Sequence, residues 1–217
     1  MEFISTLSQF DKDFLLLLNG IHNNYFDKFM YAFTQIFVWI PFYITVIYTL
    51  FRQRKKEALW LVAILIICVA LSDQLSSGLI KNTVQRLRPS NDPSVQGLIH
   101  IVNNYRGGLY GFVSSHAANT FSFALLSALL FRKKEYTFAV FAWAIINCYT
   151  RIYLGVHYPF DILGGMLTGI MVATICYILL RKFKPDLLIN KTGNDTSVML
   201  PVYTLLITVA GIIIYAI

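Results

Sequence analysis

The sequence predicts an all-α integral membrane protein of one domain, residues 1–217, with six transmembrane helices and an amphipathic N-terminal helix at the membrane interface. Hydrophobic residues make up 57% of the chain and charged residues only 13%. A soluble domain usually has about 45–50% apolar residues and about 25% charged residues. The mean hydropathy is +0.61, and many basic residues gather in short clusters between apolar runs. These observations exclude a disordered chain, a soluble nucleic-acid-binding protein and a disulfide-stapled secreted scaffold.

The first element is an amphipathic helix from Phe3 to Leu18, which we expect to lie in the membrane interface. Large apolar side chains recur along it at helical spacing: Phe3, Leu7, Phe10, Phe14 and Leu17. We do not expect a secretory signal peptide, because the segment lacks a basic start and because Asp11 and Asp13 interrupt it.

Six apolar stretches follow, and a membrane-crossing helix needs about 20 such residues. They are Phe29–Phe51, Ala58–Ile80, His116–Phe131, Tyr136–Tyr153, Phe160–Leu180 and Val198–Ile217. Pro41 should kink the first helix, and the short third stretch should extend a few residues at one end. Gly165 and Gly169 form a G-x-x-x-G pattern that favours close helix packing, with a direct role in substrate binding as the alternative.

The loops between these stretches alternate in charge, which predicts their orientation. Basic residues follow the first, third and fifth stretches: Arg52, Arg54, Lys55, Lys56, Arg132, Lys133, Lys134, Arg181, Lys182, Lys184 and Lys191. By the positive-inside rule these loops are cytoplasmic, so the N-terminal helix and the loops Lys81–Ser115 and Arg151–Pro159 face the other side. The small size and short loops are typical of a bacterial protein, which predicts the inner membrane with the active site facing the periplasm.

Three cysteines, Cys68, Cys148 and Cys176, lie singly within the apolar stretches. None forms a C-x-x-C pair, so we interpret them as helix-packing residues and expect neither a disulfide framework nor a zinc site.

Three segments on the non-cytoplasmic side are rich in polar side chains: 81–89, 113–116 and 150–161. Counting the stretches places all three at the same membrane edge. Lys81, Arg88 and Arg151 supply three cations, and the planar fork of Arg matches phosphate oxygens. Ser114 and Ser115 precede a helix, whose first N–H groups suit an anion. The segments therefore predict a phosphate-binding site.

Two histidines add reactive groups to this site. His157 and Asp161 are four residues apart, so a helical stretch would place them on one face. A carboxylate bonded to one ring nitrogen leaves the other nitrogen free to attack. His116, on another helix, is placed to protonate a leaving oxygen, so the set predicts covalent catalysis with His157 as the nucleophile.

Each of these residues has a simpler interpretation when it is taken alone. A Lys or Arg at a membrane edge is often an anchor, a His there is often a polar boundary residue, and a Ser pair before a helix is often an N-cap. The convergence of all of them on one face favours the phosphate site.

Together the segments resemble the three-part signature of the type-2 phosphatidic acid phosphatase superfamily: K-x6-R-P, P-S-G-H and S-R-x5-H-x3-D. The matching positions are Lys81, Arg88, Pro89, Ser114, His116, Arg151, His157 and Asp161. Three positions depart from it, with Val113 in place of Pro, Ser115 in place of Gly and Thr150 in place of Ser. Ser115 keeps its backbone N–H for phosphate, although its Cβ narrows the pocket. The resemblance covers residues 19 to 181.

The resemblance implies that His157 becomes a phosphohistidine, that Asp161 orients it and that His116 protonates the leaving group. It also implies that the phosphoryl oxygens are bound by Lys81, Arg88, Ser114, Ser115 and Arg151. It implies no metal and no other cofactor, because the cations do the work of a metal ion. Soluble vanadium haloperoxidases share this anion cradle, but six apolar stretches indicate the membrane branch.

The predicted enzyme is a membrane lipid phosphatase, and three substrate classes stay open. They are an isoprenoid carrier diphosphate such as undecaprenyl diphosphate, the phosphorylated glucosamine disaccharide of lipid A, and a glycerophospholipid phosphate such as phosphatidylglycerol phosphate or phosphatidate. The competing hypothesis is a non-catalytic protein that binds or moves phosphorylated lipids, which would need the cations but no nucleophile. The expected partners are the lipid substrate and membrane lipids, without nucleic acid, and the sequence does not define an oligomeric state.

Three further polar residues have open roles. Asp73 lies within an apolar stretch, where we expect a structural pairing more than an influence on the phosphate site. His100 is expected to be a solvated loop residue, with headgroup contact as the alternative. Arg86 either supports the phosphate site or anchors a lipid headgroup.

Overall fold

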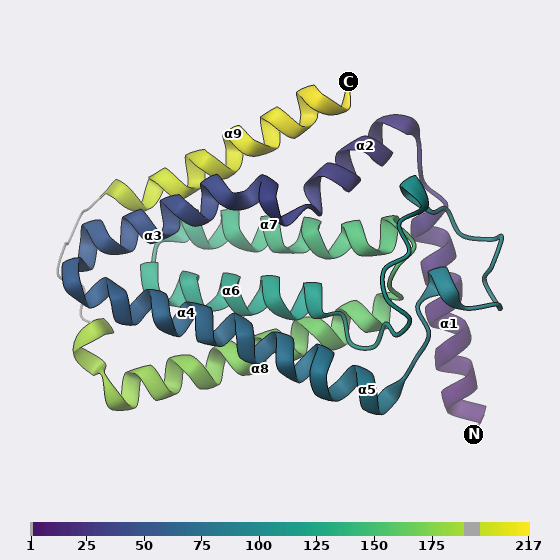
Figure 1. Cartoon of the computed structure of the whole chain (residues 1–217), viewed down its shortest axis with the longest axis horizontal. Coiled ribbons are helices and arrows are strands. Elements are labelled where there is room, and N and C mark those ends of the chain that lie inside the picture. Colours follow the sequence, from purple (N-terminus) through teal and green to yellow (C-terminus); the bar gives the residue numbers. More distant parts are fainter. Residues whose placement is uncertain (1, 189–195) are drawn as a thin grey trace.

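The computed structural model describes residues 2–188 and 196–217, and these form nine α-helices and no β-strand. Six helices form a lengthwise bundle (Figure 1): α3 (Ile40–Arg54), α4 (Ala58–Asp73), α6 (Ser115–Phe131), α7 (Lys134–Tyr153), α8 (Pro159–Phe183) and α9 (Met199–Ala216). Helix α1 (Glu2–Asn19) lies across one end of this bundle, and α2 (Asn24–Phe33) connects it to α3. Lys191 of the predicted cytoplasmic loop lies outside the described residues.

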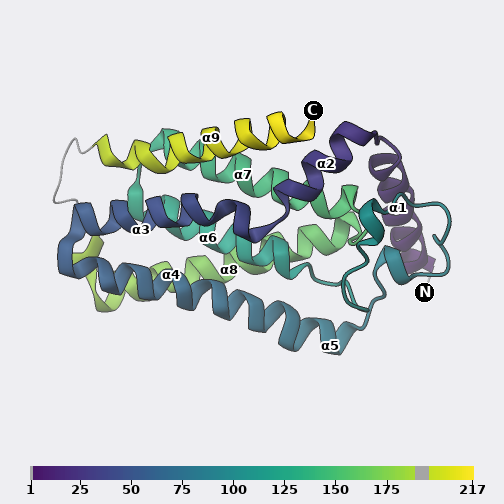
Figure 2. The same cartoon turned by 45° about the horizontal axis from the view of Figure 1, so that its top comes forward.

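Within the described residues, three helical stretches are long and apolar enough to cross a membrane: Ile36–Val84, Pro159–Phe183 and Thr196–Ala216. The first has 49 residues and turns back at Lys55, where φ is +49°. Its two limbs, α3 and α4, therefore run side by side (Figure 2). Helix α6 is apolar but shorter. The all-helical membrane fold is thus confirmed, whereas six crossings stay a prediction.

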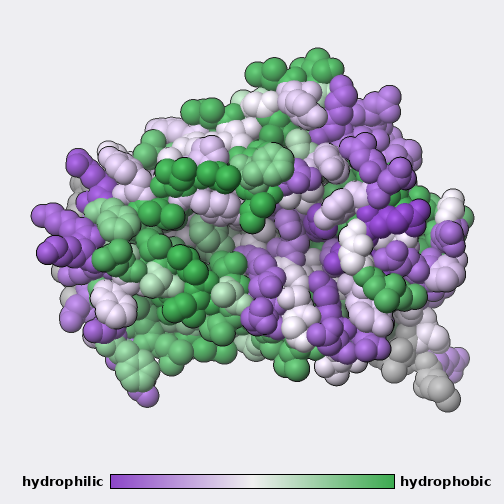
Figure 3. Space-filling view, in the orientation of Figure 1, coloured by the Kyte–Doolittle hydropathy of each residue, from purple (hydrophilic) through white to green (hydrophobic). Residues whose placement is uncertain are grey.

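The outside of the bundle exposes large apolar side chains, as a lipid-facing surface does. Ile66 on α4 is 64% exposed, Leu167 on α8 is 68% exposed and Ile207 on α9 is 71% exposed. Figure 3 shows apolar side chains gathered over the part of the molecule occupied by α3 and α4, with polar side chains toward both ends. The three cysteines are free and buried inside α4, α7 and α8, as expected for packing residues.

The first predicted stretch, Phe29–Phe51, is wrong as a single helix. Helix α2 ends at Phe33, and the chain turns before α3 begins. The indole N–H of Trp39 donates to the carbonyl oxygen of Phe33 over 2.8 Å, which satisfies a backbone group at the break. Pro41 does not kink a helix but lies in the first turn of α3, where its missing N–H costs nothing.

The expected extension of the third stretch is also wrong, because α6 is bounded at both ends. Ser114 is its N-cap and accepts a hydrogen bond from the N–H of Ala117. Arg132 adopts a left-handed conformation with φ of +52°, which ends the helix. The second stretch corresponds to α4 and the π-helical segment Gln74–Ile80 that continues it, and the last three stretches correspond closely to α7, α8 and α9.

Helices α6 and α8 approach closely at the G-x-x-x-G pattern, which confirms its packing role. A Cβ added to Gly165 would collide with the carbonyl oxygen of Ser114, and one added to Gly169 would collide with that of Ala118. The contact brings the beginning of α6 against the first turns of α8. The glycines therefore position two of the predicted catalytic segments against each other.

The N-terminal segment forms helix α1, which exposes large apolar side chains. Phe10 and Leu17 are 58% and 64% exposed, whereas Leu15 and the carboxylate-bearing Asp11 are fully buried. Its location in the membrane interface stays a prediction.

Gly165→Ala should lower the free energy of unfolding by about 1–3 kcal/mol, the usual cost of overpacking a close contact. The matched control is Gly211→Ala in α9, where an added Cβ meets nothing within 4 Å. Thermal unfolding in detergent should show a lower midpoint for the first variant only. Equal midpoints for the two variants would contradict the packing role.

Candidate active site

The three polar segments predicted from the sequence meet at one end of the bundle, near α1 (Figure 1). Lys81 begins the short helix α5 (Lys81–Val84), and Arg88 lies in the loop that leads to α6. His116 lies in the first turn of α6 and Arg151 in the last turn of α7. His157 lies in the short loop between α7 and α8. Five residues far apart in the sequence therefore surround one region.

His157 is buried and is held at both ring nitrogens. Nδ1 lies 3.3 Å from Oδ2 of Asp161, and Nε2 lies 2.8 Å from Nη1 of Arg88. A guanidinium group can only donate hydrogen bonds, so Nε2 accepts with its lone pair and Nδ1 carries the proton. This is the tautomer in which a carboxylate fixes the ring and the second nitrogen can act as a nucleophile.

The surroundings of His157 favour its neutral form. Burial lowers the pKa of His157 well below its ordinary value, and the nearby charges of Arg88, Arg151 and Lys81 lower it further. Arg88 is itself only 9% exposed and also donates to two backbone carbonyl oxygens. The neutral imidazole is the form that can attack phosphorus.

Arg151 and Lys81 are held by uncharged oxygen atoms. Arg151 is 6% exposed and donates to the hydroxyl of Thr34 over 2.8 Å and to that of Tyr105 over 3.1 Å. Nζ of Lys81 donates to Oγ of Ser115 over 2.8 Å. Charged phosphate oxygens are stronger acceptors than these hydroxyls, so they can replace or join them.

Ser114 has the capping geometry that competes with a phosphate-binding role. Its Oγ accepts from the N–H of Ala117 at 3.4 Å, and its own N–H donates to the carbonyl oxygen of Asp161 at 2.9 Å. The second bond ties the beginning of α6 to α8. Phosphate binding by the Ser114 hydroxyl stays a prediction.

His116 approaches the same region from α6. Its Nε2 lies 3.3 Å from Oδ1 of Asn147, whose amide nitrogen donates to the carbonyl oxygen of Trp143 over 3.0 Å. That second bond orients the amide, so Oδ1 accepts and Nε2 of His116 carries the proton. Asn147 has no motif in the sequence, and only the structure shows that it orients His116.

The comparisons with known proteins agree with this geometry. A family model described as the PAP2 superfamily matches residues 57–185, which is more than half of the chain. The chain belongs to the PAP2 superfamily. The superfamily membership predicted from the sequence is therefore confirmed, and the lipid phosphatases among the relatives of the chain bear out the predicted class of enzyme.

Two relatives of this PAP2 protein are lipid A 4′-phosphatases. That of Bacteroides thetaiotaomicron is 39% identical over 99% of this chain and 98% of the relative. That of Porphyromonas gingivalis is 36% identical over 77% of this chain and 71% of the relative. A solved structure, the transmembrane PAP2-type phosphatidylglycerolphosphate phosphatase from Bacillus subtilis, has a TM-score of 0.62 and 20% identity over 82% of this chain and 88% of that chain. This last likeness concerns the fold alone.

Asp11 of this PAP2 site escaped the sequence analysis, whereas Arg86 supports the site, which is one of the two roles that the sequence left open. Nη1 of Arg86 donates to Oδ1 of Asp161 over 3.0 Å, and Nη2 donates to Oδ2 of Asp11 over 2.7 Å. Arg86 thus binds two carboxylates, one of them from the N-terminal helix. Only the spacing of Arg86 from Arg88, which puts both in one loop, could have indicated its position.

The other open residues are also placed. Asp73 accepts from the amide nitrogen of Asn119 over 2.9 Å and from Ser77, which confirms the expected structural pairing. The expectation of a solvated His100 is wrong. Its Nε2 lies 2.9 Å from Oδ1 of Asp27, and its ring stacks on that of His22 with centroids 3.8 Å apart.

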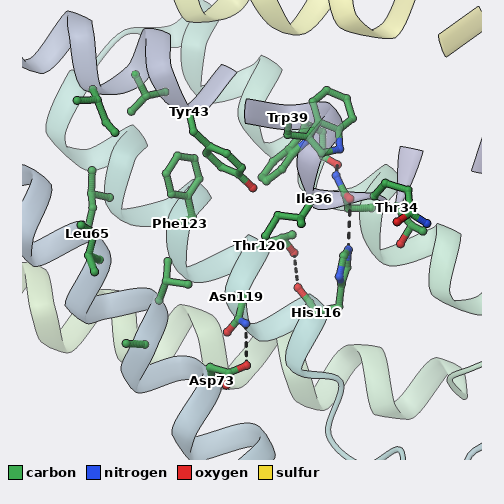
Figure 4. A pocket seen from close by; sticks show the side chains of 18 of the residues that line it. Thr34, Ile36, Trp39, Tyr43, Leu65, Asp73, His116, Asn119, Thr120 and Phe123 are labelled. Atoms are coloured by element: carbon green, nitrogen blue, oxygen red, sulfur yellow. Dashed lines mark hydrogen bonds between the residues drawn. The ribbon is translucent and has the colours of Figure 1, made fainter. Parts of the chain in front are cut away.

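A cavity of about 720 Å³ extends from this site into the bundle between α3, α4, α6 and α7. Arg151 and His116 line its polar end, and side chains such as Val46 and Leu65 line the rest. Figure 4 shows His116, Thr120 and Phe123 following one another along α6. Its size and apolar lining are typical of sites for small hydrophobic ligands.

His157 should stay neutral, with the proton on Nδ1, at pH values where an ordinary imidazole is already protonated. Its pKa is lowered, so the neutral form persists below the ordinary imidazole value of about 6.5 and is lost only at lower pH. Imidazole ¹⁵N chemical shifts of labelled protein would measure this, with His157→Gln assigning the signal. A midpoint at or above pH 6.5 would contradict the assignment.

Proposed function

We propose that this lipid phosphatase removes the 4′-phosphate of lipid A through a phosphohistidine intermediate. The observation that carries the choice of substrate is the 39% identity with a lipid A 4′-phosphatase over nearly the full length of both chains. The undecaprenyl and glycerophospholipid substrates are the alternatives that the experiment below separates.

The first chemical step uses the lone pair of His157. Nε2 attacks the phosphorus, the N–P bond forms, and the bond from phosphorus to the lipid oxygen breaks. Nδ1–H stays hydrogen-bonded to Asp161, which stabilises the positive charge that develops on the ring. Nη1 of Arg88 donates to this lone pair, so a bound phosphate group must first draw that N–H onto its own oxygens.

His116 supplies the proton that the lipid oxygen needs on leaving. Its Nε2–H stays hydrogen-bonded to Asn147, so the proton that is transferred comes from Nδ1 of the protonated ring. The negative charge of a bound phosphate offsets the repulsion between this protonated ring and Arg151. In the second step water attacks the phosphohistidine, His116 takes a proton from that water, and inorganic phosphate leaves as the N–P bond breaks.

The cations stabilise the charge that develops on the transferring phosphoryl group. Arg88 and Arg151 are largely buried, where their interactions with phosphate oxygens are stronger than in water. With Lys81 they supply three positive charges around His157. We infer that the reaction needs no metal ion.

The cavity offers a place for an acyl chain of the substrate. It joins the phosphate region at His116 and Arg151 to an apolar interior between the helices. A lipid could thus put its phosphate beside His157 and one alkyl chain among the helices. A soluble phosphate would use only the polar end.

The proposed membrane arrangement has six crossings, with α1 in the interface and the active site facing the periplasm of a bacterial inner membrane. The basic clusters after α3, α6 and α8 support this orientation. Arg88, Arg151 and His157 then lie at the opposite edge from those clusters, where the lipid headgroup would enter.

Purified protein should release phosphate from lipid A faster than from undecaprenyl diphosphate or phosphatidylglycerol phosphate, and the product should retain its 1-phosphate. Activity should persist in excess EDTA. His157→Ala should lower kcat by about 10⁴-fold or more, while His22→Ala, on an exposed residue, should not. Preference for another lipid would overturn the substrate, and EDTA inhibition reversed by Mg²⁺ would overturn the metal-free mechanism.

Ala70→Trp should fill part of the cavity and raise KM for the lipid substrate about tenfold. This factor corresponds to the loss of burial of about two CH₂ groups of the acyl chain, at about 0.8 kcal/mol for each group. Hydrolysis of a short water-soluble phosphate ester should not change. Leu71→Trp is the matched control, because Leu71 is 51% exposed and does not line the cavity. Equal effects on both substrates would contradict an acyl-chain site.

A further inference from the structure

Asp11 is a buried carboxylate carried by the N-terminal helix into the active-site end of the bundle. It is fully buried, and its two oxygens have different partners. Oδ1 accepts from the backbone N–H of Phe160 over 2.9 Å, and Oδ2 accepts from Nη2 of Arg86 over 2.7 Å. Phe160 lies in the first turn of α8, so Asp11 also interacts favourably with the positive end of that helix.

Arg86 joins this carboxylate to the catalytic pair. Its two terminal nitrogens reach Asp11 and Asp161 separately, at 2.7 and 3.0 Å. Its guanidinium carbon lies 4.0 Å from the centre of the Tyr158 ring. This cation–π contact fixes the orientation of the planar guanidinium group. Arg86 is therefore fixed by three contacts, and a Lys could not reproduce its two-way hydrogen bonding.

The charges around His157 explain why Arg86 is bonded to two carboxylates. Arg88, Arg151, Lys81 and His116 lie near His157 on the cationic side, and Asp161 is its carboxylate partner. If Arg86 paired with Asp161 alone, its positive charge would offset the negative charge of the carboxylate that His157 contacts. Asp11 supplies a second anion, so the positive charge of Arg86 is shared between two carboxylates. The guanidinium can therefore orient Asp161 without neutralising it alone.

We infer that Asp11 and Arg86 form a positioning pair, which orients Asp161 and tunes the electrostatic field at His157. This inference rests on the proposed role of His157 as the nucleophile. It gives α1 a part in the chemistry, because the helix that exposes Phe10 and Leu17 also delivers Asp11. Correct docking of α1 on the bundle then becomes a condition for full activity.

The test compares Asp11→Asn and Arg86→Gln with the matched control Asp13→Asn. Asp13 lies on the same helix but is exposed and bonds only to Gln9 among the contacts described for it. The first two variants should lower kcat about 10- to 100-fold, the usual range for residues that orient a functional group. The control should keep the wild-type rate.

The pH dependence separates positioning from a merely structural role. Asp11→Asn removes a negative charge, so His157 should lose its proton more readily and stay neutral to lower pH. Arg86→Gln removes a positive charge, so His157 should protonate at higher pH. The ratio of variant to wild-type kcat/KM cancels the titration of the substrate. This ratio should fall from pH 7 to pH 5 for Arg86→Gln and should not fall for Asp11→Asn.

A third variant separates charge from geometry and guards against misfolding. Arg86→Lys keeps the charge but not the fork, so its kcat should fall while its activity ratio stays flat with pH. Wild-type kcat in Asp11→Asn and Arg86→Gln would overturn the inference. So would flat activity ratios in both, together with lowered unfolding midpoints, since these indicate a structural role. Full activity in His157→Ala would instead overturn the proposed function.

Discussion

The carboxylate of Asp161 is the group on which the rest of the site depends. It is fully buried and accepts hydrogen bonds from the ring of His157, from Arg86 and from the backbone N–H of Tyr158. A buried carboxylate is costly unless such donors compensate for lost water. Each of these hydrogen bonds fixes one feature of the site. The bond from His157 fixes its tautomer, the bond from Arg86 fixes the position of the guanidinium, and the bond from Tyr158 fixes the first turn of α8. The buried charge of Asp161 thus orients the proposed nucleophile, holds Arg86 and fixes the beginning of α8.

Helix packing brings the remaining groups to this carboxylate. Gly165 allows α6 to approach α8 so closely that the N–H of Ser114 donates to the carbonyl oxygen of Asp161. The same approach places His116 and Ser115 at the beginning of α6, where Lys81 reaches Ser115. The cations are then held in a partly buried region by hydroxyls and carbonyl oxygens, which leaves their net positive charge available to a phosphate.

The sequence was informative wherever chemistry follows from spacing or composition. The four-residue interval between His157 and Asp161 predicted their contact, and counting apolar stretches brought segments 81–89, 113–116 and 150–161 to one end. It could not predict contacts that depend on how helices cross. Asp11 looked like an interruption of an apolar run, and Asn147 like an ordinary polar residue in a helix. The break before α3 was missed because it depends on Arg151 of α7, which donates to Thr34, and on the indole of Trp39, which turns back onto the carbonyl oxygen of Phe33.

The central claim, that Nε2 of His157 attacks phosphorus, is tested most directly by trapping the covalent intermediate. Protein mixed with a lipid substrate labelled in its phosphate should be quenched in denaturant at alkaline pH, where phosphohistidine survives, and the labelled peptide should be sequenced. The label should lie on His157 and should be absent from His157→Ala. Turnover without any labelled protein, or label on a different residue, would contradict the central claim.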